Sequence, residues 1–174
     1  MSQYGLNPEL HAQIARELYD AEKTVRPVTL LTERYPHMTQ EDSYAIQREG
    51  LKLRLADGAK IVGRKIGITS RGMMKQLNCD TPDFGCLLAH TEIAEGGACK
   101  RDELNVPIVE GELAFIMGED LDGGAVSAAR VAAAIEAVSI VKPACAKFIP
   151  AIANEKPATA TIAVEIAVAN AAQA

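Results

Sequence analysis

Residues 106–117 have the sequence VPIVEGELAFIM, an apolar run that the two glutamates Glu110 and Glu112 interrupt. In an extended strand, successive side chains alternate between faces, so both glutamates lie on the same face. A buried carboxylate without a partner is costly, and two neighbouring carboxylates repel one another. A cation between them would remove both costs, and carboxylate oxygens suit Mg²⁺ or Mn²⁺. The same spacing also fits an edge strand whose glutamates are simply solvated.

Length and composition favour one domain with a sizeable core, since the chain has 174 residues of which 48% are hydrophobic. The 18 basic and 23 acidic residues give a net charge of −5 without a long basic run, so we expect no nucleic-acid partner. We also expect a cytoplasmic protein without a membrane partner, because no apolar stretch approaches a membrane span and the N-terminus lacks signal-peptide features. The scattered cysteines and histidines do not have zinc-site spacing.

Capping residues predict where several helices begin, namely after Asn7, Thr39, Ser70 and Ser127. The helix after Ser127 is expected to carry Val131, Ile135 and Val138 on one face. Strands are predicted over residues 60–69, 86–89 and 106–117. Beyond Pro143 the chain is rich in alanine, and residues 159–168 fit either a strand or a helix. The whole pattern indicates an α+β fold.

A lysine between two glycines marks the predicted strand at residues 60–69, which reads KIVGRKIGIT. Gly63, Lys65 and Gly67 share one face of such a strand, so the ammonium stands between two positions that have no side chain. Glycine weakens a strand unless something must approach its backbone closely. This pattern is reasonable for the floor of a pocket that holds an anionic substrate. The alternative is a surface lysine on a strand that uses glycine for bending or a bulge.

The segment TPDFG at residues 81–85 has the residues of a turn. Asp83 is therefore either a turn-former that accepts a backbone hydrogen bond or a positioned acid/base. Phe84 is either an apolar wall of a pocket or an anchor in the core. The sequence alone leaves both alternatives open.

Taken together and in order, VGRKIGIT at 62–69, TPDFG at 81–85 and VEGELAF at 109–115 resemble the 2-keto-4-pentenoate (2-hydroxypentadienoate) hydratase family, which is related to fumarylacetoacetate hydrolase. The resemblance extends from the N-terminal helix to about Val138. It implies N-terminal helices followed by a mixed β-sheet or β-roll of the fumarylacetoacetate hydrolase-like type. We expect one hydratase-like domain over residues 1–174, family-like over 1–138 and atypical over the alanine-rich tail at 143–174.

The resemblance also implies an activity, a lyase reaction of the meta-cleavage route of aromatic hydrocarbon catabolism. This reaction is the metal-dependent hydration of 2-hydroxypenta-2,4-dienoate to 4-hydroxy-2-oxopentanoate. By the resemblance, Glu110 and Glu112 match metal ligands for Mg²⁺ or Mn²⁺, while Lys65 and Asp83 match catalytic residues. The substrate pocket would include Gly63, Gly67 and Phe84. The expected partners are the small 2-oxo or 2-hydroxydienoic acid and further subunits, in a homo-oligomer or in a complex with a related decarboxylase or hydratase or a downstream aldolase.

One departure from the family pattern concerns the region after Val138. The resemblance implies a third metal-binding glutamate there, but residues 140–148 read IVKPACAKF and contain none. We therefore expect a truncated or frame-altered member of the family, whose turnover could be absent. Two alternatives remain. One is a 2-oxo-3-hexenedioate (4-oxalocrotonate) decarboxylase, and the other is an inactive truncated paralogue that binds a partner subunit.

Overall fold

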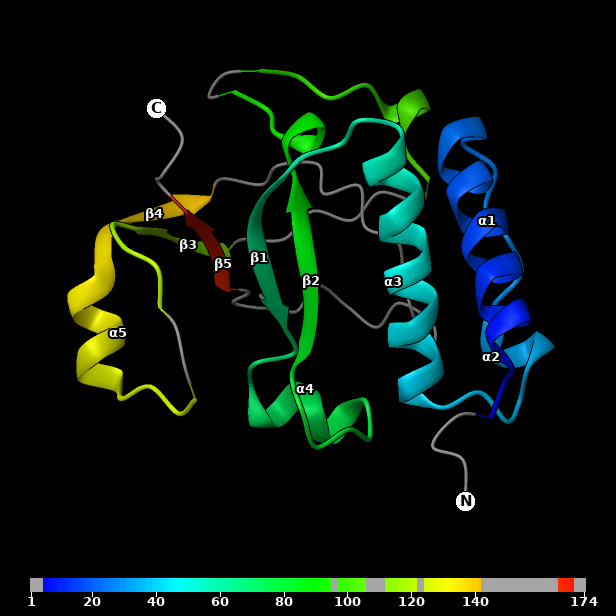
Figure 1. The fold of residues 1–174 in the computed structure, drawn as a ribbon, viewed down its shortest axis with the longest axis horizontal. Helices are drawn as coiled ribbons and strands as arrows, with labels where there is room; N and C mark the ends of the chain where they lie inside the picture. The colour runs from blue at the N-terminus through cyan, green and yellow to red at the C-terminus, as the bar shows by residue number, and fades with distance from the viewer. Residues whose placement is uncertain (1–4, 95–96, 106–111, 122–123, 142–165, 171–174) are drawn as a thin grey trace. The chain divides into compact units, whose positions relative to one another are not determined.

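The computed structural model describes residues 5–94, 97–105, 112–121, 124–141 and 166–170. Within them the chain divides into two compact units. The first comprises residues 5–59 and 97–105, and the second comprises the described residues of 60–94, 112–141 and 166–170. Helices and strands are both present, which fits the predicted α+β class (Figure 1). Whether 1–174 forms one hydratase-like domain stays a prediction.

The first unit is built from the helices α1 (Pro8–Thr24), α2 (Leu31–Arg34) and α3 (Gln40–Ala56), with a short 3-10 helix η2 (Arg101–Glu103). Figure 1 shows α1 and α3 side by side. The predicted cap of α1 is confirmed, since the Asn7 side chain accepts a hydrogen bond of 2.8 Å from the Leu10 N–H. The buried cluster that joins the helices consists of Ile14, Ala15, Leu31 and Ile46. Burial of these apolar side chains stabilises the unit.

A fully buried carboxylate fixes the start of α3. Asp42 forms the predicted capping box with Thr39, because each residue's side chain bonds the other's backbone N–H. It also accepts hydrogen bonds from the backbone N–H groups of Gly5 and Leu6, and its Oδ1 lies 2.7 Å from His11 Nε2. One side chain thus joins the N-terminal segment, α1 and α3.

The second unit contains a five-stranded sheet with the order β2-β1-β5-β3-β4. Its strands are β1 (Ile61–Gly67), β2 (Asp83–Leu88), β3 (Glu112–Met117), β4 (Ile135–Val141) and β5 (Ile166–Asn170). Neighbours are antiparallel except β3 and β5, which are parallel. The sheet is therefore mixed, as the resemblance implied. Residues 166–170 of the alanine-rich tail form the central strand, so residues 166–168, the described part of the segment 159–168, are a strand.

The helices of the second unit are short. Ser70 caps α4 (Arg71–Gln76) and Ser127 caps α5 (Ala128–Ala134), as predicted, and a 3-10 helix η1 (Ala89–Thr91) follows β2. The predicted extension of the helix after Ser127 is wrong, because Ile135 and Val138 belong to β4. The β-branched residues of this segment pair with β3, and this pairing ends the helix at Ala134. In the described part of the chain, no helix has the length and apolar content that crossing a membrane requires.

Candidate active site

Asp83 is a strand residue, so the turn that the composition of residues 81–85 suggested does not extend to it. It is the first residue of β2 and lies opposite Gly67 of β1, while Gly85 lies opposite Lys65. Pairing with β1 thus extends the strand through the segment whose composition suggested a turn. The Asp83 carboxylate accepts a hydrogen bond of 2.9 Å from the Phe84 N–H. This contact is the local backbone bond that the sequence suggested, made by a residue in a strand.

Lys65 and Asp83 lie on the same face of the sheet. Residues directly opposite one another in a strand pair point to the same side, and so do residues two apart along a strand. Asp83 therefore shares a face with Gly67, and Gly67 shares it with Lys65 and Gly63. Both glycines are buried. The predicted arrangement of an ammonium between two positions without side chains is confirmed by the described strand.

Glu112 belongs to this face as well. Lys65 is opposite Ala167 of β5, Ala167 is opposite Ala114 of β3, and Glu112 is two residues from Ala114. The Lys65 ammonium donates a hydrogen bond to Glu112 Oε1 over 3.3 Å, although 47 positions separate the two residues. The two side chains are only 16% and 14% exposed. This ion pair is therefore shielded from water far more than a surface pair would be.

Three positions beside Lys65 are glycines and have no side chain. Gly63 and Gly67 flank it along β1, and Gly85 is opposite it on β2. We call these three residues the glycine floor. The sequence analysis missed Gly85, because only the pairing of two strands shows which residue stands opposite Lys65. Gly85 is partly exposed, so a ligand can approach the backbone closely at this position.

Two predicted site residues are not part of this arrangement as the structure describes it. Phe84 is opposite Ile66, so it lies on the other face of the sheet from Lys65, and it is 51% exposed. Phe84 therefore does not line a pocket beside Lys65 on that face. Glu110 lies outside the described residues, and its role as a ligand stays a prediction. Within the described part, no group of three His, Cys, Asp or Glu residues could hold a metal ion.

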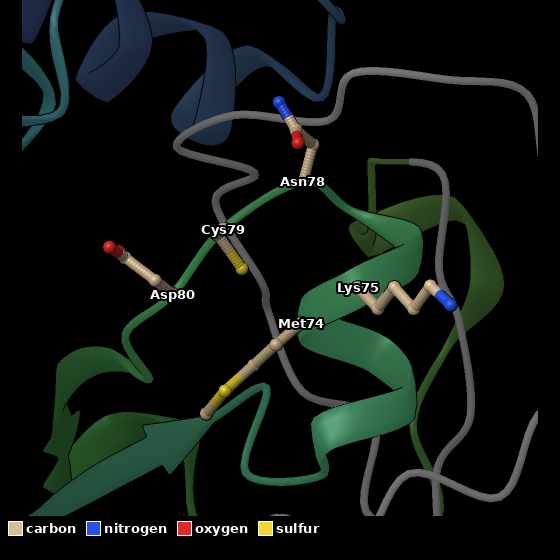
Figure 2. Close-up of a pocket in the computed structure, with 5 residues that line it drawn as sticks. All are labelled: Met74, Lys75, Asn78, Cys79 and Asp80. Carbon is tan, nitrogen blue, oxygen red and sulfur yellow. The ribbon is translucent and has the colours of Figure 1, made fainter.

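The second unit also has an open concavity next to α4 (Figure 2). It is lined by Met74, Lys75, Asn78, Cys79 and Asp80. In Figure 2 the Lys75 amine and the Asp80 carboxylate point away from each other, so these charged groups do not converge on one ligand. Catalysis needs groups that converge on the reacting atoms. The candidate active site is therefore the sheet face with Lys65, Asp83 and Glu112.

Two curated hydratases are similar to this chain. A 2-hydroxyhexa-2,4-dienoate hydratase from Comamonas testosteroni is 40% identical over 126 residues, which cover 71% of this chain and 48% of that protein. A 2-keto-4-pentenoate hydratase from Paraburkholderia xenovorans (strain LB400) is 36% identical over 117 residues, which cover 67% of this chain and 44% of that protein. The matched part of the chain is therefore similar to 2-keto-4-pentenoate hydratases and related dienoate hydratases. The chain spans about half the length of these curated relatives.

A solved structure is similar to this chain in its α+β fold. A 4-oxalocrotonate decarboxylase from Pseudomonas putida G7, complexed with magnesium and adipate, is 31% identical with a TM-score of 0.74. The match covers 79% of this chain and 52% of that chain. No family model matches the chain.

Proposed function

We propose that this chain carries a hydratase site that adds water to 2-hydroxypenta-2,4-dienoate and gives 4-hydroxy-2-oxopentanoate. The observation that carries the proposal is the shielded pair of Lys65 and Glu112 beside the glycine floor, in a chain whose curated relatives are named as hydratases of such dienoates. The substrate is a carboxylate, and Lys65 is the basic residue of β1, β2 and β3 on this sheet face. We infer that the carboxylate or the adjacent 2-oxygen binds next to its ammonium.

The proposed site takes a divalent cation, for which Mg²⁺ is the first choice and Mn²⁺ the second. Glu112 fits such an ion, since it is a little-exposed hard oxygen donor, and Glu110 is the proposed second ligand. The magnesium in the similar decarboxylase supports this part of the proposal. When bound, the cation would supply Lewis-acid stabilisation of negative charge on the substrate's carboxylate and 2-oxygen.

Hydration then requires two proton movements that the chain's own residues can serve. First, the enol loses its hydroxyl proton and C5 gains a proton, which gives the conjugated 2-oxo acid. Second, water adds across C3 and C4, with its oxygen at C4 and a proton at C3. We propose that the Lys65 ammonium stabilises the negative charge on O2, while Asp83 carries the proton as a general acid and base.

Decarboxylation of 2-oxo-3-hexenedioate is the second candidate, because the similar solved structure is a decarboxylase. That substrate has a second carboxylate. Among the described residues that β1, β2 and β3 place on this sheet face, Lys65 is the one basic side chain. A second anionic group would therefore find no cationic partner on these strands, and the hydratase is the better match.

The test is turnover of 2-hydroxypenta-2,4-dienoate by the full chain with Mg²⁺ or Mn²⁺. We expect dienol absorbance to decay faster than in a metal-only control, and 4-hydroxy-2-oxopentanoate to form. Release of CO₂ from 2-oxo-3-hexenedioate without hydration of the dienoate would favour the decarboxylase. Rates equal to the metal-only control for both substrates would refute both activities.

A further inference from the structure

The side chains of β2 on the active-site face change from charged to apolar along the strand. Asp83, Gly85 and Leu87 occupy this face in steps of two residues, about 7 Å apart. Gly85 is opposite Lys65, and Leu87 is opposite Gly63. Leu87 is partly exposed, so its side chain is available for contact. The glycine floor therefore has a carboxylate at one end and a branched apolar side chain at the other.

Strand β3 shows the same change from charged to apolar side chains on the same face of the sheet. On β3, Glu112 is followed on the same face by Ala114 and Ile116. The register places Glu112 at the level of Gly67, and it places Ile116 at the level of Gly63 and Leu87. Ile116 is 37% exposed. Two strands thus bring charged residues to one end of the face and large apolar residues to the other.

A small 2-oxo acid has the same polarity, with a charged head and a carbon tail. With its head beside Lys65 and Glu112, its tail can extend past Gly85, which has no side chain and is partly exposed. Leu87 is then the first side chain that β2 presents beyond Gly85. A carboxylate brought there would lose water against an apolar group without gaining a partner.

We propose that Leu87 is a specificity-determining residue that sets the length and the polarity of the substrate's tail. It favours a short apolar tail and disfavours a second carboxylate. The proposal rests on the proposed function for the position of the head. The relatives differ in this part of the ligand, since one is named for a hexadienoate and another for a pentenoate, while adipate in the similar decarboxylase is a dicarboxylate.

The experiment measures, by calorimetry with Mg²⁺, the binding of analogues that have no carbon–carbon double bond and so cannot be hydrated. The probes are 2-oxopentanoate, 2-oxoheptanoate and 2-oxohexanedioate. We expect the wild-type chain to bind 2-oxopentanoate most tightly. Leu87→Ala should improve the affinity for 2-oxoheptanoate relative to 2-oxopentanoate by about tenfold, because the side chain that limits the tail is shortened. Leu87→Arg should improve the relative affinity for 2-oxohexanedioate by at least about tenfold.

The matched control is Leu77→Ala, the same truncation at a 40% exposed leucine outside the sheet, which should leave the three affinities in their wild-type ratio. Thermal unfolding reports whether each variant is folded, and Leu87→Lys offers a second cationic replacement if the arginine is not tolerated. Unchanged affinity ratios in folded Leu87 variants would overturn the inference, and so would a wild-type chain that binds none of the analogues. Graded binding without hydration of the dienoate would overturn the proposed function alone.

Discussion

The ammonium of Lys65 lies 3.3 Å from a carboxylate oxygen of Glu112, on a strand that is not its neighbour. β5 runs between the two strands, so the two side chains reach each other across it. In a place with so little exposure, the two charges interact more strongly than a solvated pair does. The ion pair thus places the proposed anion-binding group, Lys65, in contact with the proposed metal ligand, Glu112.

Removal of the Lys65 charge should abolish most of the turnover. In Lys65→Met the side chain keeps a similar length but cannot stabilise negative charge on the substrate. We expect kcat for 2-hydroxypenta-2,4-dienoate to fall by about 10²- to 10³-fold. The control is Lys60→Met, at an exposed lysine next to the same strand, which should keep the wild-type rate. A Lys65→Met variant that is folded and fully active would contradict the assignment.

Glu112→Gln should weaken metal binding specifically. The amide keeps the shape of the side chain but loses the negative charge that a hard divalent cation prefers. We expect the Kd for Mg²⁺, measured by calorimetry, to rise by at least about tenfold. Glu136→Gln, at an exposed glutamate of β4, removes the same charge elsewhere on the sheet. Equal Mg²⁺ affinity in both variants would show that Glu112 is not a ligand.

The local features of the fold could be predicted from the sequence because they depend on neighbouring residues. Asn7, Thr39, Ser70 and Ser127 cap helices as expected, since each bonds an N–H three residues further on. The shared face of Gly63, Lys65 and Gly67 follows in the same way from the period of a strand. These inferences need no knowledge of which segments pair.

The remaining features depend on strand pairing, which sequence periodicity does not determine. The spacing of Val131, Ile135 and Val138 fits a helix, but pairing with β3 makes the last two residues part of a strand. Asp83 has the neighbours of a turn residue, yet it pairs with Gly67.

The position of Gly85 opposite Lys65, and of Phe84 on the other face, likewise follows from the register between β1 and β2. Register is only weakly specified in glycine-rich strands, so the sequence alone does not predict this pairing.

Asp83→Asn should slow proton transfer and leave binding nearly intact. The amide cannot take up and release a proton as a carboxylate can, so we expect kcat to fall by about 10²- to 10⁴-fold with little change in KM. A second readout is the exchange of the C3 protons of 2-oxopentanoate with D₂O, followed by NMR, which should slow in parallel. Asp80→Asn, at an exposed residue before the strand, is the control. A loss confined to KM would indicate that Asp83 only binds the substrate.

Asp42 should make the stability of the helical unit depend on acid pH. Burial alone would raise its pKa, but the hydrogen bonds from the Thr39 backbone, His11 and the Gly5 backbone outweigh this effect and hold the pKa of Asp42 well below its usual range. Because the carboxyl is more acidic in the folded state, its contribution is complete above the unfolded-state pKa of about 4 and is lost as the pH falls below that value. The wild-type free energy of unfolding should therefore decrease between about pH 5 and pH 3.

The decisive variant to compare with wild type is Asp42→Asn. The asparagine amide cannot accept all of the hydrogen bonds that the Asp42 carboxylate accepts. At pH 7 we expect this variant to lose about 3 kcal/mol or more of unfolding free energy, measured by urea titration with helical circular dichroism. Its deficit relative to wild type should narrow as the pH falls below about 4, because the wild-type carboxyl is then protonated in the unfolded state. Asp20→Asn, at an exposed position of α1, should show neither the loss nor the narrowing. A deficit that stays constant from pH 7 to pH 3 would mean that the charge of Asp42 does not stabilise the junction of the N-terminal segment with α1 and α3.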